Sequence, residues 1–169
     1  MRSRSRSSVN KKIITLDELS EKSERLRSAG KRVIATNGCF DILHVGHVRY
    51  LAAARKLGDV LVVGVNGDNS VCQLKGEGRP INREQDRAEV LAALEAVDYV
   101  TIFPELRATN FLQAAQPAIY AKGGDYTADT LDPEERAVLE KFGTRIEIIP
   151  FETGYSTSQL LTRIGERDD

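Results

Sequence analysis

Both histidines of this 169-residue chain lie within one short segment, residues 36–47. Residues 31–36, which lead into it, are typical of a buried strand, and the alanine- and leucine-rich residues 48–57 that follow are typical of an amphipathic helix. His44 and His47 are therefore expected at a turn from strand to helix. The start of the helix offers unpaired backbone N–H groups and the positive end of its dipole. This placement predicts that both imidazoles face one phosphate.

Two other roles for the histidines stay open at the level of the residues. With Asp41 they could ligate zinc, although a catalytic zinc site needs a third protein ligand and a structural site a fourth, and Asp41 is the one obvious addition. They could also simply cap the helix. Gly46 argues against capping alone, because glycine is costly inside a helix unless something must approach its backbone closely. We therefore assign no metal ligands.

Basic side chains next to glycine-rich turns are further candidates for phosphate binding. Lys75 and Arg79 belong to a glycine-rich connection that could fold over a polyphosphate, and solvated loop charges are an equally good interpretation. Lys122 ends an apolar segment and is followed by two glycines, so its ammonium and the backbone can both meet a ligand. The sequence contains neither G-x-x-x-x-G-K-[ST] nor a G-x-G-x-x-G after the first strand, which disfavours P-loop kinases and dinucleotide dehydrogenases.

Three polar side chains near the end of the chain have a structural and a functional interpretation. Asp125 could cap a turn or accept hydrogen bonds from ribose or sugar hydroxyls. Ser156 and Ser158 are first of all helix-capping hydroxyls. A capped helix start that faces the site could still bind phosphate.

Strand-like and helix-like segments alternate along the whole chain. A capping box at Thr15 to Glu18 opens the first helix, which Gly30 closes. Asn82 is expected to cap a helix with Val90, Leu91 and Leu94 on one side. Further helices are expected after His47, from Thr109, at residues 132–143 and at residues 156–165. The expected strands are residues 31–36, 59–65, 99–103, 118–121 and 145–149, and a polar loop is expected at residues 66–69.

This alternation predicts the α/β class, with a single doubly wound parallel sheet and helices on both faces. In such folds ligands bind beyond the carboxyl ends of the strands, where the polar segments of this chain fall. We expect a flexible basic tail over residues 1–12 and one domain over residues 13–169.

The amino-acid composition argues against some classes of binding partner for this protein. The 24 basic and 25 acidic residues leave a net charge of −1, so no overall field favours nucleic acid or an anionic membrane. No segment is long and apolar enough to span a bilayer, and the start lacks the apolar core of a signal peptide. The two cysteines are expected to be free thiols. Together these features predict a cytoplasmic protein.

Residues 36–47 fit the pattern T-x-G-x-F-D-x-x-H-x-G-H throughout, and the chain thereby resembles the HxGH nucleotidyltransferases, which include cytidylyltransferases and adenylyltransferases. Residues 154–158 resemble the second signature of that superfamily, Gly-Ile-Ser-Thr-Ser/Thr, with Tyr155 in place of the isoleucine. Residues 74–80, the helix of residues 87–98 and residues 121–126 are similar to the adenylyltransferase domain of ADP-heptose synthases. That similarity runs from about residue 16 to residue 164.

The resemblance implies transfer of AMP from ATP, with Mg²⁺, to D-glycero-β-D-manno-heptose 1-phosphate. It also implies a nucleotidyltransferase fold of the Rossmann-like type and, since the family is often dimeric, a homodimer. Phe151 stands where glycerol-phosphate cytidylyltransferases usually carry an arginine, which disfavours CTP. Alternatives that stay open are a glycerol-phosphate or ethanolamine-phosphate cytidylyltransferase, an FMN adenylyltransferase and a nucleotide-binding sensor without catalysis.

The resemblance also implies a role for each matching residue. The expected catalytic groups, which stabilise charge without moving protons, are His44, His47 and Lys75. The residues expected to bind the nucleotide are Asn37, Gly38, Cys39, Phe40, Gly46, Arg87, Gly123, Ser156, Thr157 and Ser158. The residues expected to bind the sugar phosphate are Asp41, Lys122 and Asp125.

Overall fold

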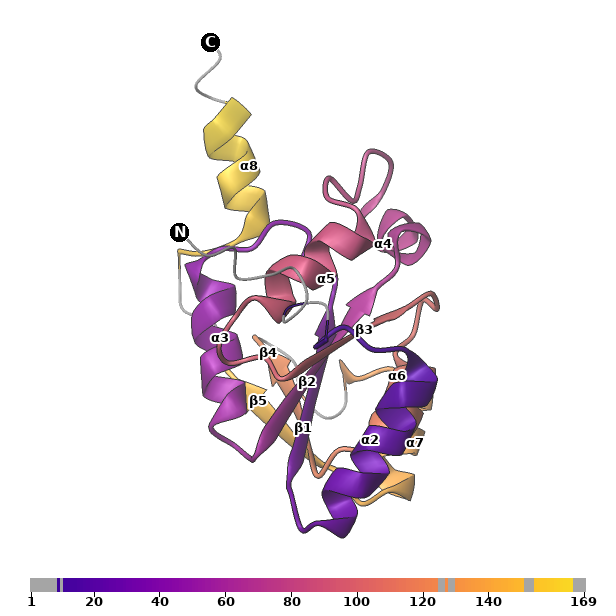
Figure 1. Ribbon diagram of the computed structural model, residues 1–169. Helices are drawn as coiled ribbons and strands as arrows, with labels where there is room; N and C mark the ends of the chain where they lie inside the picture. The colour runs from indigo at the N-terminus through magenta and orange to yellow at the C-terminus, as the bar shows by residue number, and fades with distance from the viewer. Residues whose placement is uncertain (1–8, 10, 125–126, 128–129, 151–153, 166–169) are drawn as a thin grey trace.

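The computed structural model describes residues 9, 11–124, 127, 130–150 and 154–165, which form one five-stranded parallel sheet with helices around it (Figure 1). The strand order is β3-β2-β1-β4-β5, and every neighbouring pair is parallel. The strands are β1 (Val33–Gly38), β2 (Val60–Asn66), β3 (Tyr99–Phe103), β4 (Ile119–Gly123) and β5 (Arg145–Ile149). The predicted doubly wound parallel sheet is confirmed.

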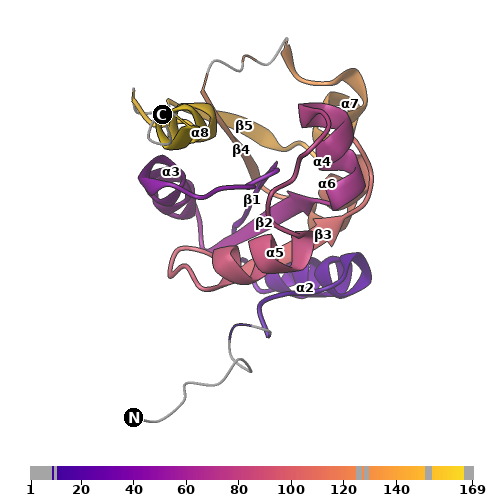
Figure 2. The same ribbon diagram turned by 90° about the horizontal axis from the view of Figure 1, so that it is seen from above.

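Helices cover both faces of the sheet (Figure 2), and alternate residues of the strands belong to two separate cores, one on each face. On β1, Ile34 points to one face, whereas Val33 and Ala35 point to the other. The face of Ile34 is covered by α3 (Val45–Arg55) and α5 (Glu84–Ala92). The opposite face is covered by α2 (Leu16–Ser28), α6 (Thr109–Ala115) and α7 (Pro133–Lys141). Strands buried on both faces account for the unbroken apolar segments in the sequence.

Side-chain caps fix where two of these helices begin. The Thr15 hydroxyl accepts from Glu18 N at 3.2 Å while the Glu18 carboxylate accepts from Thr15 N at 2.8 Å, which confirms the capping box. Asp132 accepts from Glu134 N at 2.9 Å at the start of α7. Both caps satisfy N–H groups that would otherwise lack an intrahelical partner.

Three expectations about the middle of the chain are wrong. Asn82 does not cap α5, which begins after Arg83; its side-chain amide donates instead to Asp41 O at 2.7 Å. Val90 is 51% exposed, so it does not share the buried side of Leu91. The polar segment after β2 forms a helix, α4 (Asp68–Lys75), and the last residue of this helix is Lys75.

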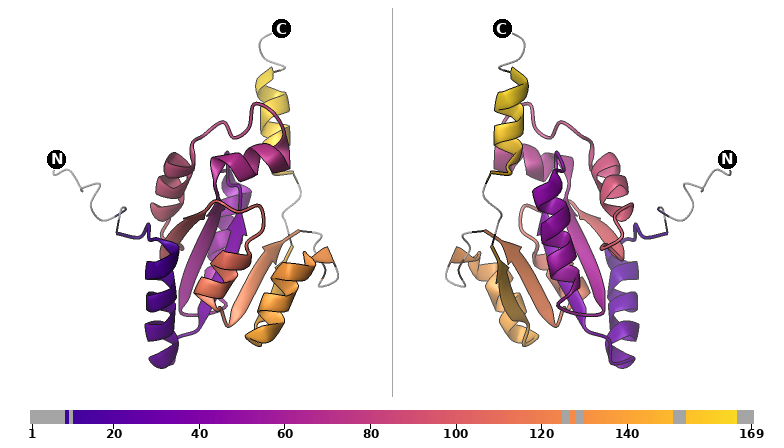
Figure 3. Two further views of the ribbon diagram at one scale, coloured as in Figure 1. Left: turned by 90° about the vertical axis from the view of Figure 1, so that its right-hand side faces the viewer. Right: turned by 90° about the vertical axis from the view of Figure 1, so that its left-hand side faces the viewer.

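The sheet order places the carboxyl ends of β1 and β4 next to each other. The chain leaves β1 on one side toward β2 and returns to pair β4 on the other side, so the order reverses between β1 and β4. Crevices at such switch points are where open α/β sheets bind ligands. The loop from β1 to α3 and the last helix, α8 (Thr157–Gly165), both stand at this edge (Figure 3).

Most of the predicted tail, residues 1–12, lies outside the described residues. Lys12 is described, and its ammonium donates to Val97 O at 2.7 Å and to Leu94 O at 3.2 Å. No helix within the described part of the chain is long and apolar enough to cross a membrane.

Candidate active site

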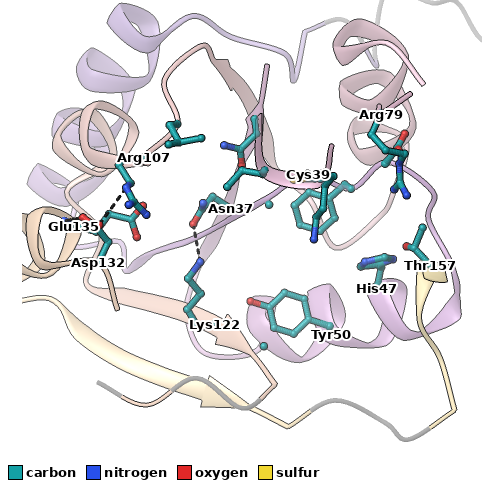
Figure 4. A pocket seen from close by; sticks show the side chains of 18 of the residues that line it. Asn37, Cys39, His47, Tyr50, Arg79, Arg107, Lys122, Asp132, Glu135 and Thr157 are labelled. Carbon is teal, nitrogen blue, oxygen red and sulfur yellow. Dashed lines mark hydrogen bonds and ion pairs between the residues drawn. The ribbon is translucent and has the colours of Figure 1, made fainter. Parts of the chain in front are cut away.

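A cavity of about 510 Å³ opens at the carboxyl ends of β1, β2 and β4 (Figure 4). This volume suits a nucleotide-sized ligand. The predicted site residues that line it are Asn37, Gly38, Cys39, Phe40, Asp41, His47, Lys75, Lys122, Gly123, Thr157 and Ser158. The predicted site residues that do not line it are His44, Gly46, Arg87 and Ser156. Asp125 lies outside the described residues.

The two histidines pack against each other at the start of α3, with ring centroids 3.9 Å apart. The backbone N–H of His44 donates to His47 Nδ1 at 3.3 Å. A nitrogen that accepts a hydrogen bond carries no proton, so neutral His47 holds its proton on Nε2. His47 can therefore donate one N–H bond to a ligand in the cavity.

Both imidazoles are held in the neutral form. Burial, and to a smaller extent the neighbouring His44, lower the pKa of His47 to about 4. Burial also lowers the pKa of His44 below its usual 6.5. Near neutral pH the pair therefore acts through N–H dipoles rather than through two positive charges, which agrees with a role in which no proton is moved.

The titration of the two histidines gives a direct check, since the chain has only these two. We expect the imidazole proton signal of His47 to titrate near pH 4 and that of His44 below pH 6.5 in NMR spectra. Because the folded pKa of each lies below its unfolded value, the unfolded chain binds more protons, and stability falls as the pH drops from 6.5. Two signals that titrate at 6.5 or above would contradict the burial of the pair.

Gly46 is explained by the position of the His44 ring. A Cβ built on Gly46 would lie 2.9 Å from two ring atoms of His44 and 3.1 Å from Tyr155 Cβ. The close approach predicted from the sequence is thus made by side chains of the protein itself. Gly46 lets the His44 ring lie flat between α3 and Tyr155, whose ring stacks on it with centroids 6.5 Å apart.

Gly46→Ala should therefore act through His44. We expect the new methyl group to displace the ring and to lower the transfer rate roughly 10- to 100-fold, less than complete loss of one catalytic donor. The thermal midpoint should change little or rise, because alanine is the better helix former. Gly58→Ala is unsuitable as a control, since a Cβ there would lie 2.5 Å from Ile34 Cδ1. Cys72→Ala, at an exposed thiol on α4, is the neutral comparison.

The Asp41 carboxylate is bound by groups of the protein itself, whereas the sequence analysis expected it to bind the sugar phosphate. Its carboxylate is 2.6 Å from Arg79 Nε and accepts from Ile81 N and Asn82 N at 2.9 Å each. Burial raises the pKa of this carboxyl, but the two backbone N–H groups and Arg79 outweigh burial and lower it. Asp41 thus fastens the segment after α4 to the loop that carries the histidines.

Arg87 lies behind that loop rather than in the cavity. It is 2% exposed, and its nitrogens donate to Cys39 O at 2.5 Å and Asn82 O at 3.0 Å and pair with Asp68 at 2.8 Å. These contacts use all three guanidinium nitrogens to hold together the loop after β1, the segment before α5 and the start of α4. The structure therefore places Arg87 where it supports the backbone of the predicted nucleotide site.

The potential metal ligands among the described residues do not come together at one place. The described residues contain no group of three His, Cys, Asp or Glu side chains that could hold a metal ion, and the Asp41 carboxylate is turned away to Arg79 and the backbone. The zinc site considered from the sequence is thus not assembled by these residues. Mg²⁺ that enters on a nucleotide needs few protein ligands, because phosphates and water fill most of its positions.

The start of α8 closes the cavity on the side of the histidines. Ser156 Oγ accepts from Gln159 N at 3.1 Å, which is the capping contact expected from the sequence. Thr157 Oγ1 donates to Ile42 O at 3.3 Å and so ties the helix to the histidine loop. The two predicted motifs, far apart in the sequence, therefore meet at one site.

Tyr50 is a cavity residue that the sequence analysis did not single out. Its hydroxyl lies 2.7 Å from Thr36 Oγ1 and donates to Ala121 O at 3.0 Å, so it joins α3 to both β1 and β4. Burial raises its pKa to about 12. Its place three residues after His47, on the same side of α3, was a signal that could have identified it.

The other cavity residues outside the predicted site set come from segments that lie far apart in the sequence. They are Asn66, Leu74, Arg79, Leu106, Arg107, Thr130, Leu131, Asp132 and Glu135. Arg79 belongs to the glycine-rich connection that the sequence analysis had named for phosphate binding, whereas Asn66 is the last residue of β2. Asp132 caps α7 and also lines the cavity.

The sequence model of the cytidylyltransferase-like family matches residues 35–163. The chain is 47% identical over 161 residues to the bifunctional protein HldE of Pelobacter propionicus, covering 95% of this chain and 33% of that protein. It is 43% identical over 163 residues to HldE of Aliarcobacter butzleri, covering 96% of this chain and 33% of that protein. The chain thus spans about a third of the length of these relatives.

Solved structures are similar as well. The crystal structure of a lipopolysaccharide core biosynthesis protein from Thermoplasma volcanium matches with a TM-score of 0.60 and 30% identity, over 75% of this chain and 100% of that chain. Pantoate-β-alanine ligase from Francisella tularensis matches with a TM-score of 0.55 and 16% identity, over 86% of this chain and 68% of that one. The second likeness shows the fold alone.

Proposed function

The chain belongs to the cytidylyltransferase-like family of nucleotidyltransferases, and from this premise we propose that it transfers AMP from ATP to D-glycero-β-D-manno-heptose 1-phosphate, yielding ADP-heptose and pyrophosphate. The observation that carries the proposal is the single cavity in which the loop after β1, Lys75, Lys122 and the start of α8 meet. The similarity to HldE proteins and to a lipopolysaccharide core biosynthesis protein supports a heptose acceptor.

The chemistry fits charge stabilisation by fixed donors. An acceptor phosphate oxygen forms a bond to the α-phosphorus of ATP in line, and the bond from that phosphorus to the bridging oxygen breaks as pyrophosphate leaves. The attacking phosphate is already ionised and pyrophosphate leaves as an anion, so no general base is required. Positioning and electrostatic stabilisation supply the catalysis.

The main groups at the site have the following places in this scheme. His47 Nε2–H donates to a phosphate oxygen that gains charge, His44 holds His47 and the loop in position, and the Cys39 and Phe40 N–H groups assist. Lys75 neutralises the leaving phosphates. Lys122, whose pKa is lowered by burial and raised in part by Glu135 and Cys39, meets the acceptor phosphate.

The proposal also covers the form in which ATP binds, the oligomeric state of the protein and its location. ATP binds as its Mg²⁺ complex, in which the phosphates hold the ion and the ion offsets their negative charge. Assembly as a homodimer and a cytoplasmic location are the remaining predictions of the sequence.

A matrix of the four nucleoside triphosphates against candidate phosphates, scored by pyrophosphate release, tests the proposal. We expect ATP with heptose 1-phosphate to stand out. A larger signal with CTP and glycerol or ethanolamine phosphate, or with ATP and FMN, would replace it by one of those activities. Binding of ATP without release from any pair would favour a sensor.

A further inference from the structure

The end of the cavity far from His47 is lined by Arg107, Asp132 and Glu135, which we call the distal wall. Figure 4 shows these three side chains at one end and His47 with Thr157 at the other, with Asn37 and Lys122 between them. The distal wall comes from the loop before α6 and from the start of α7. None of its three residues contacts the reacting phosphates in the scheme described above.

Glu135 presents a carboxylate to the cavity. The residue is 7% exposed, and its Oε1 accepts from Ala108 N at 2.8 Å. The side chain also lines the cavity. Because Oε1 is held by the backbone bond, Oε2 is the oxygen to which a ligand hydroxyl can donate.

Asp132 and Arg107 form the edge of the distal wall. Asp132 Oδ2 lies 3.1 Å from Arg107 Nε, and Asp132 Oδ1 accepts from Glu134 N at 2.9 Å. The Asp132 side chain is 14% exposed and that of Arg107 is 52% exposed. The ion pair holds the guanidinium at the mouth of the cavity, where its terminal N–H groups can donate to a ligand oxygen.

Lys122 separates the distal wall from the predicted transfer site. Its ammonium lies 3.5 Å from Asn37 Oδ1, at the end of β1, and it is close enough to Glu135 for the carboxylate to stabilise its charge. An acceptor phosphate at Lys122 leaves room for the rest of its molecule beside Glu135, at the end of the cavity away from His47. A second phosphate would be repelled there by the carboxylate, whereas hydroxyl groups would donate to it.

We propose that the distal wall binds the hydroxyl groups of the acceptor, with one hydroxyl donating to Glu135 Oε2. This inference rests on the proposed function and extends it to the residues that select the acceptor. It assigns Glu135 to substrate specificity and leaves the transfer step to the histidine loop.

Glu135→Gln tests the proposal with little change of shape. The amide oxygen can still accept from Ala108 N, while an NH₂ group replaces the Oε2 acceptor. We expect the KM and Kd for heptose 1-phosphate to rise about tenfold or more, as for loss of a hydrogen bond to a charged group. The KM for ATP should stay within about twofold. Glu134→Gln, an exposed first-turn residue of the same helix, is the matched control and should change neither constant.

Two further measurements keep the test decisive. Ethyl phosphate, which has no hydroxyl, should bind wild type and Glu135→Gln equally weakly in calorimetry. Arg107→Gln, at a half-exposed side chain, should raise the KM for the acceptor about threefold or more without lowering stability, which provides a second probe if Glu135→Gln fails to fold.

The outcomes separate this inference from the proposed function. An unchanged acceptor KM in Glu135→Gln, or an equal rise in the KM values for ATP and acceptor, would overturn the hydroxyl subsite. Transfer by wild type to another phosphorylated polyol, weakened in Glu135→Gln, would support the subsite and overturn the heptose acceptor.

Discussion

His47→Ala is expected to lower the transfer rate below detection, by a factor on the order of 10² to 10³. The substitution removes the Nε2–H donor that the bond from His44 N to His47 Nδ1 directs into the cavity. ATP affinity should fall much less, because the donor acts mainly on charge that develops in the transition state. Single-turnover measurements with saturating ATP and acceptor separate the two effects.

The fold should survive this change. His47 lies at the surface of the cavity rather than in either core, so circular dichroism and the thermal midpoint should match wild type. His47→Asn, which keeps one N–H donor on a shorter side chain, should recover part of the rate. Retention of more than about a tenth of the wild-type rate in His47→Ala would exclude the assigned role.

Asp41→Asn is expected to cost about 2 kcal/mol of unfolding free energy and to raise the KM for ATP. The Asp41 carboxylate, 2% exposed, takes charge-assisted bonds from Arg79 and from two backbone N–H groups, and each such bond contributes roughly 1.5–3 kcal/mol. Asparagine keeps one oxygen and loses the charge. The segment after α4 that carries Arg79 then loosens over the cavity. Urea unfolding and steady-state kinetics measure the two effects.

The pH dependence of this loss has a definite sign. The pKa of Asp41 is lowered in the folded protein, so its stabilisation is present above its usual pKa of 3.8 and is lost as the pH falls through the lower folded value. The stability gap between wild type and Asp41→Asn should therefore narrow in acid. Asp86→Asn, at an exposed carboxylate on α5, is the control and should leave stability within about 0.5 kcal/mol. A gap that widens in acid would contradict the assignment.

The sheet could be predicted because its strands are buried on both faces. Residues 59–65 and 99–103 are apolar segments that cannot face water, and caps such as Thr15 and Asp132 mark helix starts by local bonds. The helix α4 was missed because Val71 is its one buried apolar side chain. Its position depends on the sheet beneath it more than on its own pattern.

The histidine loop could be predicted for the same local reason, since residues 36–47 carry both imidazoles and the glycine that admits His44. The partners of Asp41 and the composition of the distal wall could not be predicted from the sequence. Asp41 meets Arg79 across 38 residues of sequence, and Ala108 meets Glu135 across 27. Such contacts follow from the strand order β3-β2-β1-β4-β5, which brings distant loops to one edge and which no single segment encodes.

Following the phosphorus atoms of ATP tests the central claim most directly. Wild type is incubated with heptose 1-phosphate and ATP labelled with ³²P at either the α- or the γ-position, and the products are separated. The account predicts that the α-label enters ADP-heptose, that the γ-label enters pyrophosphate, and that His47→Ala produces neither. Transfer of the γ-label to the sugar phosphate, or release of the α-label as free AMP whether or not the acceptor is present, would contradict it.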